Sequence, residues 1–365
     1  MTLTEKRAYN FNAGPSALPL EVLKKAQQEL LNFDHSGMSV MELSHRSSTF
    51  EKVHNEAIER LRKLYAIPEN YEVLFIQGGA SLQFSMIPMN FLASEQTASY
   101  VNTGAWSDKA IKEAKLFGNV QIAGSSKENN YTYIPELSEL NISADDSYVH
   151  ITSNNTIFGT QWKDFPTTQD VPLIADMSSD ILSKRIDISK FALIYAGAQK
   201  NLGPSGVTVV IIRKDLLEKE NKAIPTMLKY STYASNNSLY NTPPTFGIYM
   251  LGEVLKWVEA EGGLEAIETR NHFKAKLIYD AIDESNGFYT GHAQVASRSL
   301  MNITFRVSDE QLEKQFLVEA KEAGFVGLEG HRSVGGCRAS TYNAVPVETC
   351  QALANFMNEF RAKHQ

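Results

Sequence analysis

The sequence places a lysine where burial would change its chemistry. Lys200 stands in LIYAGAQKNLGPSG, directly after an apolar run, among small residues and without an adjacent carboxylate. Desolvation at the mouth of a sheet would lower the pKa of its amine below the usual value of about 10.4 and make it a Schiff-base nucleophile. The alternative is a surface lysine in a turn, so the residues around Lys200 have to distinguish the two.

An aspartate follows another apolar run in the same way. Asp176 ends the run in PLIADMSSDILS, 24 residues before Lys200. At the edge of a sheet, such a carboxylate could keep a heterocyclic nitrogen protonated, as a pyridinium electron sink requires. Asp176 alone is equally compatible with a metal ligand or a helix cap. The pair of Lys200 and Asp176 therefore carries more information than either residue.

A glycine pair indicates a place for a phosphate group. FIQGGASLQFSMIP puts Gly78 and Gly79 between an apolar run and a helix that opens near Ala80 and Ser81. Backbone amides at a helix N-terminus and the Ser81 hydroxyl could bind an anion. The spacing matches neither GxGxxG nor a P-loop, and a tight turn is the alternative.

Aromatic and basic residues complete the set. Trp106, in YVNTGAWSDKA, could stack on a flat cofactor or pack against the following helix, and Thr156, in SNNTIFGTQW, also follows a predicted strand. Arginine binds carboxylate and phosphate groups through two parallel hydrogen bonds, so two basic clusters would suit a small anionic substrate if they converged. The alternative is exposed arginines in loops. The clusters contain His45 and Arg46 in MELSHRSS, and His331, Arg332 and Arg338 in GHRSVGGCRAS.

The elements that must position these residues are those of an α/β fold. Near-continuous apolar runs predict parallel strands buried on both faces, and residues 48–64 predict an amphipathic helix. The last run follows its predecessor through a short glycine-rich loop, which predicts an antiparallel pair. The predicted strands cover residues 73–76, 99–101, 148–152, 173–175, 192–196 and 207–212.

The second half of the chain changes character. Residues 218–244 are polar and without periodicity, which predicts a long surface excursion, and residues 246–285 predict helices broken at Gly262 and Gly263. The last 80 residues predict a small α+β unit over one sheet, with strands at 300–307, 325–328 and 336–342 and helices at 309–323, after a Ser308 cap, and 347–363. We therefore expect a large domain (1–250), connecting helices (251–285) and a small domain (286–365), with the N-terminal segment free to pack against the last.

Composition narrows the class of protein. A chain of 365 residues predicts about two domains. Its 35 basic and 42 acidic side chains give a net charge of -7, which argues against a nucleic-acid partner. Cys337 and Cys350 suit neither a disulfide framework nor a zinc site, and no metal is expected. Because the sequence shows no signal peptide and no membrane span, the expected location is the cytoplasm.

Seven motifs occur in an order that identifies a resemblance over essentially the whole chain. They are NFNAGPSALP, SHRS, QGGAS, ADMSSDILS, YAGAQKNLGPSG, NTPPTF and GHRSVGGCRAS. The chain resembles the phosphoserine aminotransferases, a family within class V of the fold type I pyridoxal-phosphate enzymes. The resemblance implies a large cofactor-binding domain with a mostly parallel sheet between helices, and a small α+β C-terminal domain.

The resemblance also implies roles for residues around the cofactor, pyridoxal 5'-phosphate. Lys200 would form the Schiff base, with Gln199 beside it in contact with the cofactor. Asp176 would hold the pyridine nitrogen, Trp106 would stack on the ring, and Thr156 would approach its 3'-oxygen.

Further residues would bind phosphate groups and substrates. Ala80 and Ser81 match the family's phosphate-binding helix N-terminus, although some members carry an arginine at the position of Ser81, where serine offers only a neutral hydrogen bond. Asn241 and Thr242 match residues that reach the cofactor phosphate of a neighbouring subunit, which implies a homodimer with shared active sites. The substrate clamp would consist of His45, Arg46, His331, Arg332 and Arg338.

The implied reaction is reversible transfer of an amino group between L-glutamate and 3-phosphohydroxypyruvate. It yields 2-oxoglutarate and O-phospho-L-serine and belongs to L-serine biosynthesis. The alternatives are transamination of 4-phosphohydroxy-L-threonine in vitamin B6 synthesis, another class V aminotransferase activity, and a module that binds a phosphorylated ligand without chemistry. An intact Lys200 argues against the last of these, because mere binding needs no Schiff-base lysine.

Overall fold

The larger of two bodies is built on one twisted, mixed sheet. The computed structural model describes residues 7–365. From β9 to β4 the neighbouring strands are parallel, whereas β10 runs antiparallel to both of its neighbours, as its short connection to β9 predicted. The strand order is β2 (Tyr71–Ile76), β10 (Thr208–Arg213), β9 (Leu193–Gly197), β8 (Leu173–Asp176), β5 (Val149–Thr152), β3 (Thr97–Asn102) and β4 (Asn119–Ser125).

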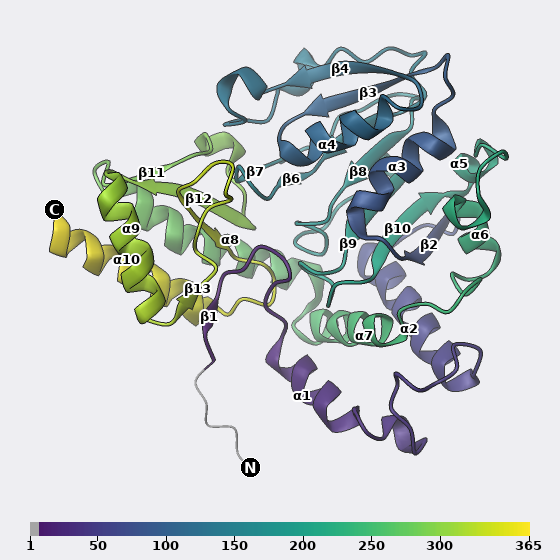
Figure 1. Cartoon of the computed structure of the whole chain (residues 1–365), viewed down its shortest axis with the longest axis horizontal. Coiled ribbons are helices and arrows are strands. Elements are labelled where there is room, and N and C mark those ends of the chain that lie inside the picture. The colour runs from purple at the N-terminus through teal and green to yellow at the C-terminus, as the bar shows by residue number, and fades with distance from the viewer. Residues whose placement is uncertain (1–6) are drawn as a thin grey trace.

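Helices cover both faces of this sheet, so its apolar strands are buried on both sides (Figure 1). The helices α3 (Gly79–Phe91) and α4 (Ala105–Ala114) pack on one face, and α2 (Ser48–Tyr65) and α7 (Thr245–Ala260) lie against the other. The predicted helix at 48–64 is thus α2, and its N-cap Ser47 accepts a hydrogen bond from the Phe50 backbone.

The smaller body contains an antiparallel sheet with the strand order β11 (Tyr289–Gly291), β12 (Asn302–Val307) and β14 (Cys337–Ser340). Its helices are α8 (Gly263–Asp283), α9 (Glu310–Glu322) and α10 (Val347–His364). The predicted cap of α9 was wrong: Asp309, not Ser308, accepts the hydrogen bonds of the first turn. A carboxylate there also complements the positive end of the helix.

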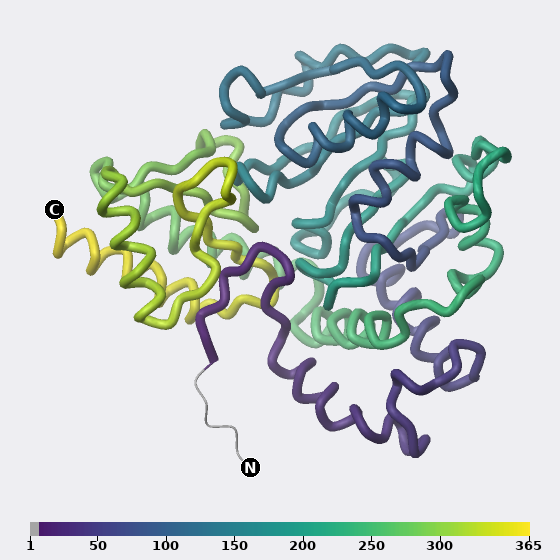
Figure 2. Tube along the Cα trace, viewed as in Figure 1, coloured from purple at the N-terminus to yellow at the C-terminus, as the bar shows by residue number. Residues whose placement is uncertain are grey.

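The N-terminal segment joins the two bodies (Figure 2). β1 (Tyr9–Asn10) pairs in parallel with β13 (Phe325–Val326), so the predicted strand at 325–328 belongs to this separate pair and not to the small sheet. Phe11 and Ala17 are buried in the core of the small body. One sheet for the whole C-terminal unit was therefore a wrong prediction, because the strand partner lies more than 300 residues away in sequence.

The remaining segments fill the edges. The polar excursion is more ordered than predicted, because it forms α6 (Tyr230–Ser235) and buries Tyr230 against Phe91 in a stacked ring pair. The other elements are α1 (Leu20–Glu29), α5 (Lys214–Glu218) and the short hairpin of β6 (Asn154–Asn155) and β7 (Thr160–Gln161). Across residues 7–365, no helix combines the length and apolar character that crossing a bilayer requires.

Candidate active site

A cavity of about 340 Å³ opens at the carboxyl ends of β5, β8 and β9. Ligand sites in open α/β sheets lie at this edge because loops from neighbouring strands meet there. Both bodies line the cavity, together with the N-terminal segment. Its lining contains Ala13, Gly14, Gly79, Ala80, Ser81, Trp106, Thr152, Asn154, Thr156, Ile157, Asp176, Ser178, Ser179, Gln199, Lys200, His331 and Arg338.

Lys200 is held in the cavity by a neutral partner. Its Nζ donates to Thr156 Oγ1 at 2.8 Å, and no ion pair is formed with it by the carboxylates of residues 7–365. Burial, with a smaller contribution from the charge of Arg338, lowers the pKa of Lys200 to about 8, and the charge of Asp176 opposes the shift. The amine therefore loses its proton more readily than the amine of a surface lysine does. The neutral amine is the form that attacks a carbonyl group.

Asp176 ends β8, directly beside the strand that leads to Lys200. The carboxylate is almost fully buried, and its Oδ1 accepts from the Ser178 backbone at 2.9 Å and the Ser178 hydroxyl at 2.6 Å. Burial raises the pKa of Asp176, while these hydrogen bonds and the Lys200 amine act in the opposite direction. Within residues 7–365 there is no group of three or more His, Cys, Asp or Glu side chains that could hold a metal ion.

The glycine pair forms an open anion cradle. Gly78 and Gly79 adopt φ values of 92° and 66°, and a Cβ on Gly78 would lie 2.5 Å from the Leu82 side chain. No side chain caps the N-terminus of α3, so its first backbone N–H groups are left for a ligand. Ala80 and Ser81 lie in this first turn and line the cavity.

Trp106 lies at the start of α4 and forms one wall. Its indole ring centroid is 5.7 Å from Lys200 Nζ and 4.3 Å from Lys109 Nζ. The indole Nε1 is buried and lacks a hydrogen-bond partner. An indole with an unmatched donor beside a lysine amine is unusual for a group that serves only packing.

The small body contributes the positive charge. Arg338 lies on β14, and its Nη1 donates to the Thr156 backbone oxygen at 3.3 Å, while its buried Nε has no partner. Burial lowers the pKa of Arg338, and no carboxylate within residues 7–365 forms an ion pair with it. His331 lines the same side, and burial together with Arg338 lowers its pKa. A buried arginine without a counter-ion is suited to an anionic ligand.

Other residues of the expected site do not line this cavity. Arg46, Arg332 and Thr242 are exposed, and His45 and Asn241 are partly buried with His45 Nε2 and Asn241 Oδ1 lacking a partner. A single chain therefore brings together the expected lysine, aspartate, tryptophan and threonine, the phosphate cradle and part of the substrate clamp. The remaining residues lie on other surfaces of the same chain.

The N-terminal segment is a part of the site to which sequence reasoning assigned no role. Ser16 Oγ donates to the Lys200 backbone oxygen at 2.5 Å, and the Ser16 backbone N–H donates to the Gln199 backbone oxygen at 3.0 Å. A Cβ on Gly14 would lie 3.4 Å from Lys200 Cγ. The motif FNAGPSALP was a signal for this contact, but nothing in it indicated which strand it would reach.

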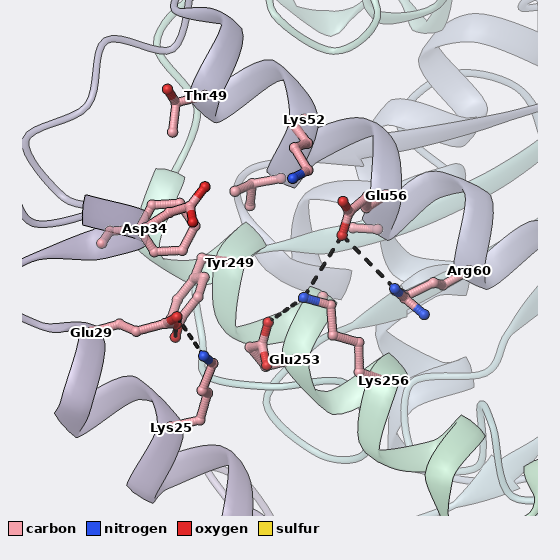
Figure 3. Close-up of a pocket in the computed structure, with 14 residues that line it drawn as sticks. Lys25, Glu29, Asp34, Thr49, Lys52, Glu56, Arg60, Tyr249, Glu253 and Lys256 are labelled. Atoms are coloured by element: carbon pink, nitrogen blue, oxygen red, sulfur yellow. Dashed lines mark hydrogen bonds and ion pairs between the residues drawn. The ribbon is translucent and has the colours of Figure 1, made fainter. Parts of the chain in front are cut away.

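A second cavity, of about 200 Å³, lies between α1, α2 and α7 (Figure 3). Most of its charged residues neutralise one another: Lys25 pairs with Glu29, and Lys256 pairs with Glu253 and Glu56. Glu56 also pairs with Arg60. The cavity has no group comparable to Lys200, so we place the chemistry at the first cavity.

The fold and the first cavity define a class V aminotransferase. The family model described as aminotransferase class-V matches residues 8–353. A phosphoserine aminotransferase from Lysinibacillus sphaericus is 74% identical over 99% of both chains. The solved phosphoserine aminotransferase of Bacillus circulans subsp. alkalophilus superimposes with a TM-score of 0.98 at 60% identity, covering 99% of this chain and 100% of its own. The chain belongs to the phosphoserine aminotransferase family.

The cofactor of this family is pyridoxal phosphate. A phosphoserine aminotransferase of Trichomonas vaginalis, solved with this cofactor bound, has a TM-score of 0.91 at 42% identity and covers 96% of this chain and 100% of its own. The cavity fits such a group, because it offers an amine for the aldehyde, a buried carboxylate for the ring nitrogen and an uncapped helix N-terminus for the phosphate. Trp106, whose buried Nε1 has no hydrogen-bond partner, lines the same cavity.

Proposed function

We propose that the protein transfers an amino group reversibly between L-glutamate and 3-phosphohydroxypyruvate, giving 2-oxoglutarate and O-phospho-L-serine for L-serine biosynthesis. The observation that carries this proposal is that one cavity contains both the Lys200 amine and the Arg338 guanidinium, and that this guanidinium has no counter-ion among residues 7–365. The names of the relatives support the substrate class.

Each end of the cavity has its own binding task. The first N–H groups of α3 and the Ser81 hydroxyl would hold the cofactor phosphate, and Trp106 would orient the ring from one side. Arg338, assisted by His331, would bind the carboxylate or phosphate of the substrate. A guanidinium accepts both groups in the same geometry, which lets glutamate and the phosphorylated keto acid use one cavity in turn.

Proton transfer falls to Lys200 and Asp176. Bound pyridoxal phosphate supplies a carbonyl carbon that takes up the amino group and a ring that withdraws electrons from the substrate Cα. The Lys200 amine removes the proton from that Cα, because burial has made it a base near neutral pH. The Asp176 carboxylate holds a proton on the ring nitrogen. Thr156 fixes Lys200 Nζ at 2.8 Å and so orients the base.

Absorption spectroscopy with single substrates tests the proposal. The purified protein should be yellow, should lose its band on adding glutamate and should regain it with 3-phosphohydroxypyruvate. Borohydride treatment should place the label on Lys200. A colourless protein without label at Lys200 would overturn the proposal. Replacing the keto acid with the phosphorylated precursor of 4-phosphohydroxy-L-threonine measures how far the site also serves vitamin B6 synthesis.

The working unit in this proposal is a homodimer with shared sites. Asn241, Thr242 and Arg46 lie outside the cavity of their own chain, and Asn241 has an unmatched buried oxygen. They would complete the partner's site, with Arg332 and His45 as further clamp residues. Mixing inactive Lys200→Ala and Asn241→Ala subunits tests this: mixed dimers should regain one intact site per pair. No regain of activity would show that each chain uses its own Asn241.

The domain limits and the location belong to the same proposal. Separate hydrophobic clusters in the two bodies support a large domain over 1–250, connecting helices over 251–285 and a small domain over 286–365. Phe11 and Ala17 assign part of the N-terminal segment to the small-domain core. The expected location is the cytoplasm.

A further inference from the structure

Behind Asp176 lies a chain of buried polar side chains that the proposed mechanism does not use. Tyr195 on β9 is the Cα partner of Asp176 on β8, so its side chain lies beside that of Asp176 on the same face of the sheet, and Tyr195 lowers the pKa of this acid. His150 on β5 continues the chain, with Nε2 at 3.0 Å from the Tyr195 hydroxyl. Tyr195 and His150 are 0% and 1% exposed, so water does not reach either group.

The direction of these hydrogen bonds follows from their chemistry. An ionised carboxylate can only accept, so the Tyr195 hydroxyl can act on Asp176 only as a donor. The Tyr195 oxygen then accepts from His150 Nε2–H, which leaves a lone pair on Nδ1. His150 Nδ1 is buried without a partner, and burial lowers the pKa of His150 to about 3, so the ring is neutral.

The position of the histidine ring is set by its neighbours. Tyr100 stacks on His150 with ring centroids 4.9 Å apart and an interplanar angle of 25°. The Tyr100 hydroxyl is engaged elsewhere, at 2.8 Å from that of Tyr148. His150 is therefore fixed with Nε2 toward Tyr195, and the Tyr195 hydroxyl is left with the carboxylate as its acceptor.

The buried polar side chains act on Asp176, whose ionised form is disfavoured by burial. A buried carboxylate tends to become protonated, and a neutral Asp176 could not hold a proton on the cofactor ring. Ser178 supplies two donors, but both reach Oδ1. Tyr195 adds a donor from the adjacent strand, and its own oxygen is polarised by His150.

We propose that Tyr195 is a positioning residue for Asp176, oriented by His150, and that this chain keeps the carboxylate ionised toward the ring nitrogen of the cofactor. The inference deepens the proposed function and rests on it, since it presupposes that pyridoxal phosphate binds in the cavity. It predicts a specific effect of one hydroxyl group, the one that faces the carboxylate.

The test compares two buried tyrosines that differ in what their hydroxyls contact. Tyr195→Phe removes the donor to Asp176 and keeps the ring, and Tyr148→Phe removes a hydroxyl that contacts only that of Tyr100 among the side chains of residues 7–365. The readouts are the ¹⁵N chemical shift of ring-labelled pyridoxal phosphate bound to the protein at fixed pH, its dissociation constant, and kcat. Thermal unfolding confirms that each variant folds.

Tyr195→Phe should move the ¹⁵N shift toward that of the unprotonated ring and lower kcat by about 10- to 100-fold, the usual effect of one hydrogen bond to a charged group. Tyr148→Phe should leave both near the wild-type values. His150→Phe keeps the Tyr195 hydroxyl but removes the hydrogen-bond partner that orients it. The ¹⁵N shift and kcat of this variant should lie between those of Tyr195→Phe and Tyr148→Phe.

An unchanged ¹⁵N shift in Tyr195→Phe would overturn the inference, even if kcat fell, because the loss would then be structural. Equal effects of Tyr195→Phe and Tyr148→Phe would overturn it as well. If Tyr195→Phe failed to fold, an unchanged shift in His150→Phe would decide against the chain. Failure of the wild-type protein to bind pyridoxal phosphate is a different outcome, since it would overturn the proposed function itself.

Discussion

Two cavities of the molecule differ in whether their charged groups are paired. In the cavity between α1, α2 and α7, Lys25, Arg60 and Lys256 each have a carboxylate partner within 4 Å (Figure 3). In the Lys200 cavity, neither Lys200 nor Arg338 has an ion pair within residues 7–365. Both cavities contain basic groups, but within the described part of the chain Lys200 and Arg338 are unpaired, whereas three of the four lysines and arginines that line the other cavity are paired and only the exposed Lys52 is not.

The difference teaches how a binding site is distinguished from a stabilising charge cluster. Paired charges at a surface contribute little and need no ligand, whereas a buried cation without a counter-ion is retained at the expense of stability. The Lys200 cavity is the larger of the two and has fewer charged residues in its lining, so the number of charges does not indicate the binding site. What separates them is whether the protein has already satisfied its own groups, and the following experiments test that distinction.

Replacement of Lys200 should have the largest effect. Lys200→Ala removes the base and nucleophile, and the transamination rate should fall by at least about 10²–10⁴-fold, the usual contribution of a positioned proton-transfer group. Steady-state assays and borohydride labelling measure this. Retained labelling elsewhere with normal activity would show that another lysine does the chemistry.

Arg338 should come next, with an effect on substrate rather than cofactor. Arg338→Ala removes charge-assisted hydrogen bonds, and KM for glutamate and for the phosphorylated keto acid should rise about 10- to 100-fold. The dissociation constant of pyridoxal phosphate should stay near the wild-type value. Arg338→Lys keeps the positive charge but cannot form two parallel hydrogen bonds, and its KM values should lie between those of the wild type and Arg338→Ala. Equal loss of substrate and cofactor binding would make Arg338 structural.

Cofactor capture should depend on pH through Lys200. The pKa of Lys200 is lowered to about 8 by burial and by Arg338, against the opposing charges of Asp176 and Asp180. Only the free amine attacks, so the capture rate of cofactor-free protein should rise about tenfold per pH unit below 8 and level off above it. In Arg338→Ala the break should move to higher pH. Stopped-flow absorbance measures both, and a pH-independent rate would contradict the assignment.

The charge cluster should show the smallest effects. Glu56→Gln removes one carboxylate partner each from Arg60 and Lys256, which keep Glu259 and Glu253, and should lower the free energy of unfolding by no more than about 1 kcal/mol, with kcat and KM unchanged. Lys52, which lines the same cavity without an ion pair among residues 7–365, provides the matched control in Lys52→Ala. Denaturant unfolding compares them. Lost activity in Glu56→Gln would mean that the second cavity also serves the reaction.

Much of the large sheet could be predicted, because near-continuous apolar runs identify buried parallel strands. β4 was missed for the same reason: Asn119–Ser125 is an edge strand in which only Ala123 is buried, so its apolar pattern is weak. The small body was harder. The assignment of Phe325–Val326 to a pair with β1 depends on a contact that no local pattern encodes.

The residues of the site also fall into those that the sequence could place and those that it could not. Lys200, Asp176 and the glycine pair follow apolar runs, so their presence at one sheet edge could be predicted from the order of elements. Gly14 and Ser16 could not be placed, because both lie against Lys200, which is 184 residues beyond Ser16 in the chain. Tyr195 and His150 look like ordinary core residues in the sequence, and only the register of β5, β8 and β9 pairs Tyr195 with Asp176 and places His150 opposite Ile174, two residues before it.

The sequence by itself determined which chemical groups are present and which edge of the sheet they share, since those follow from residue type and from the periodicity of apolar positions. Tertiary structure alone decided the state of those groups. The lowered pKa of Lys200, the ionised carboxylate proposed for Asp176 and the missing counter-ion of Arg338 all depend on desolvation and on neighbours from distant strands. Electrostatic energies depend on separation in space, which sequence separation does not measure.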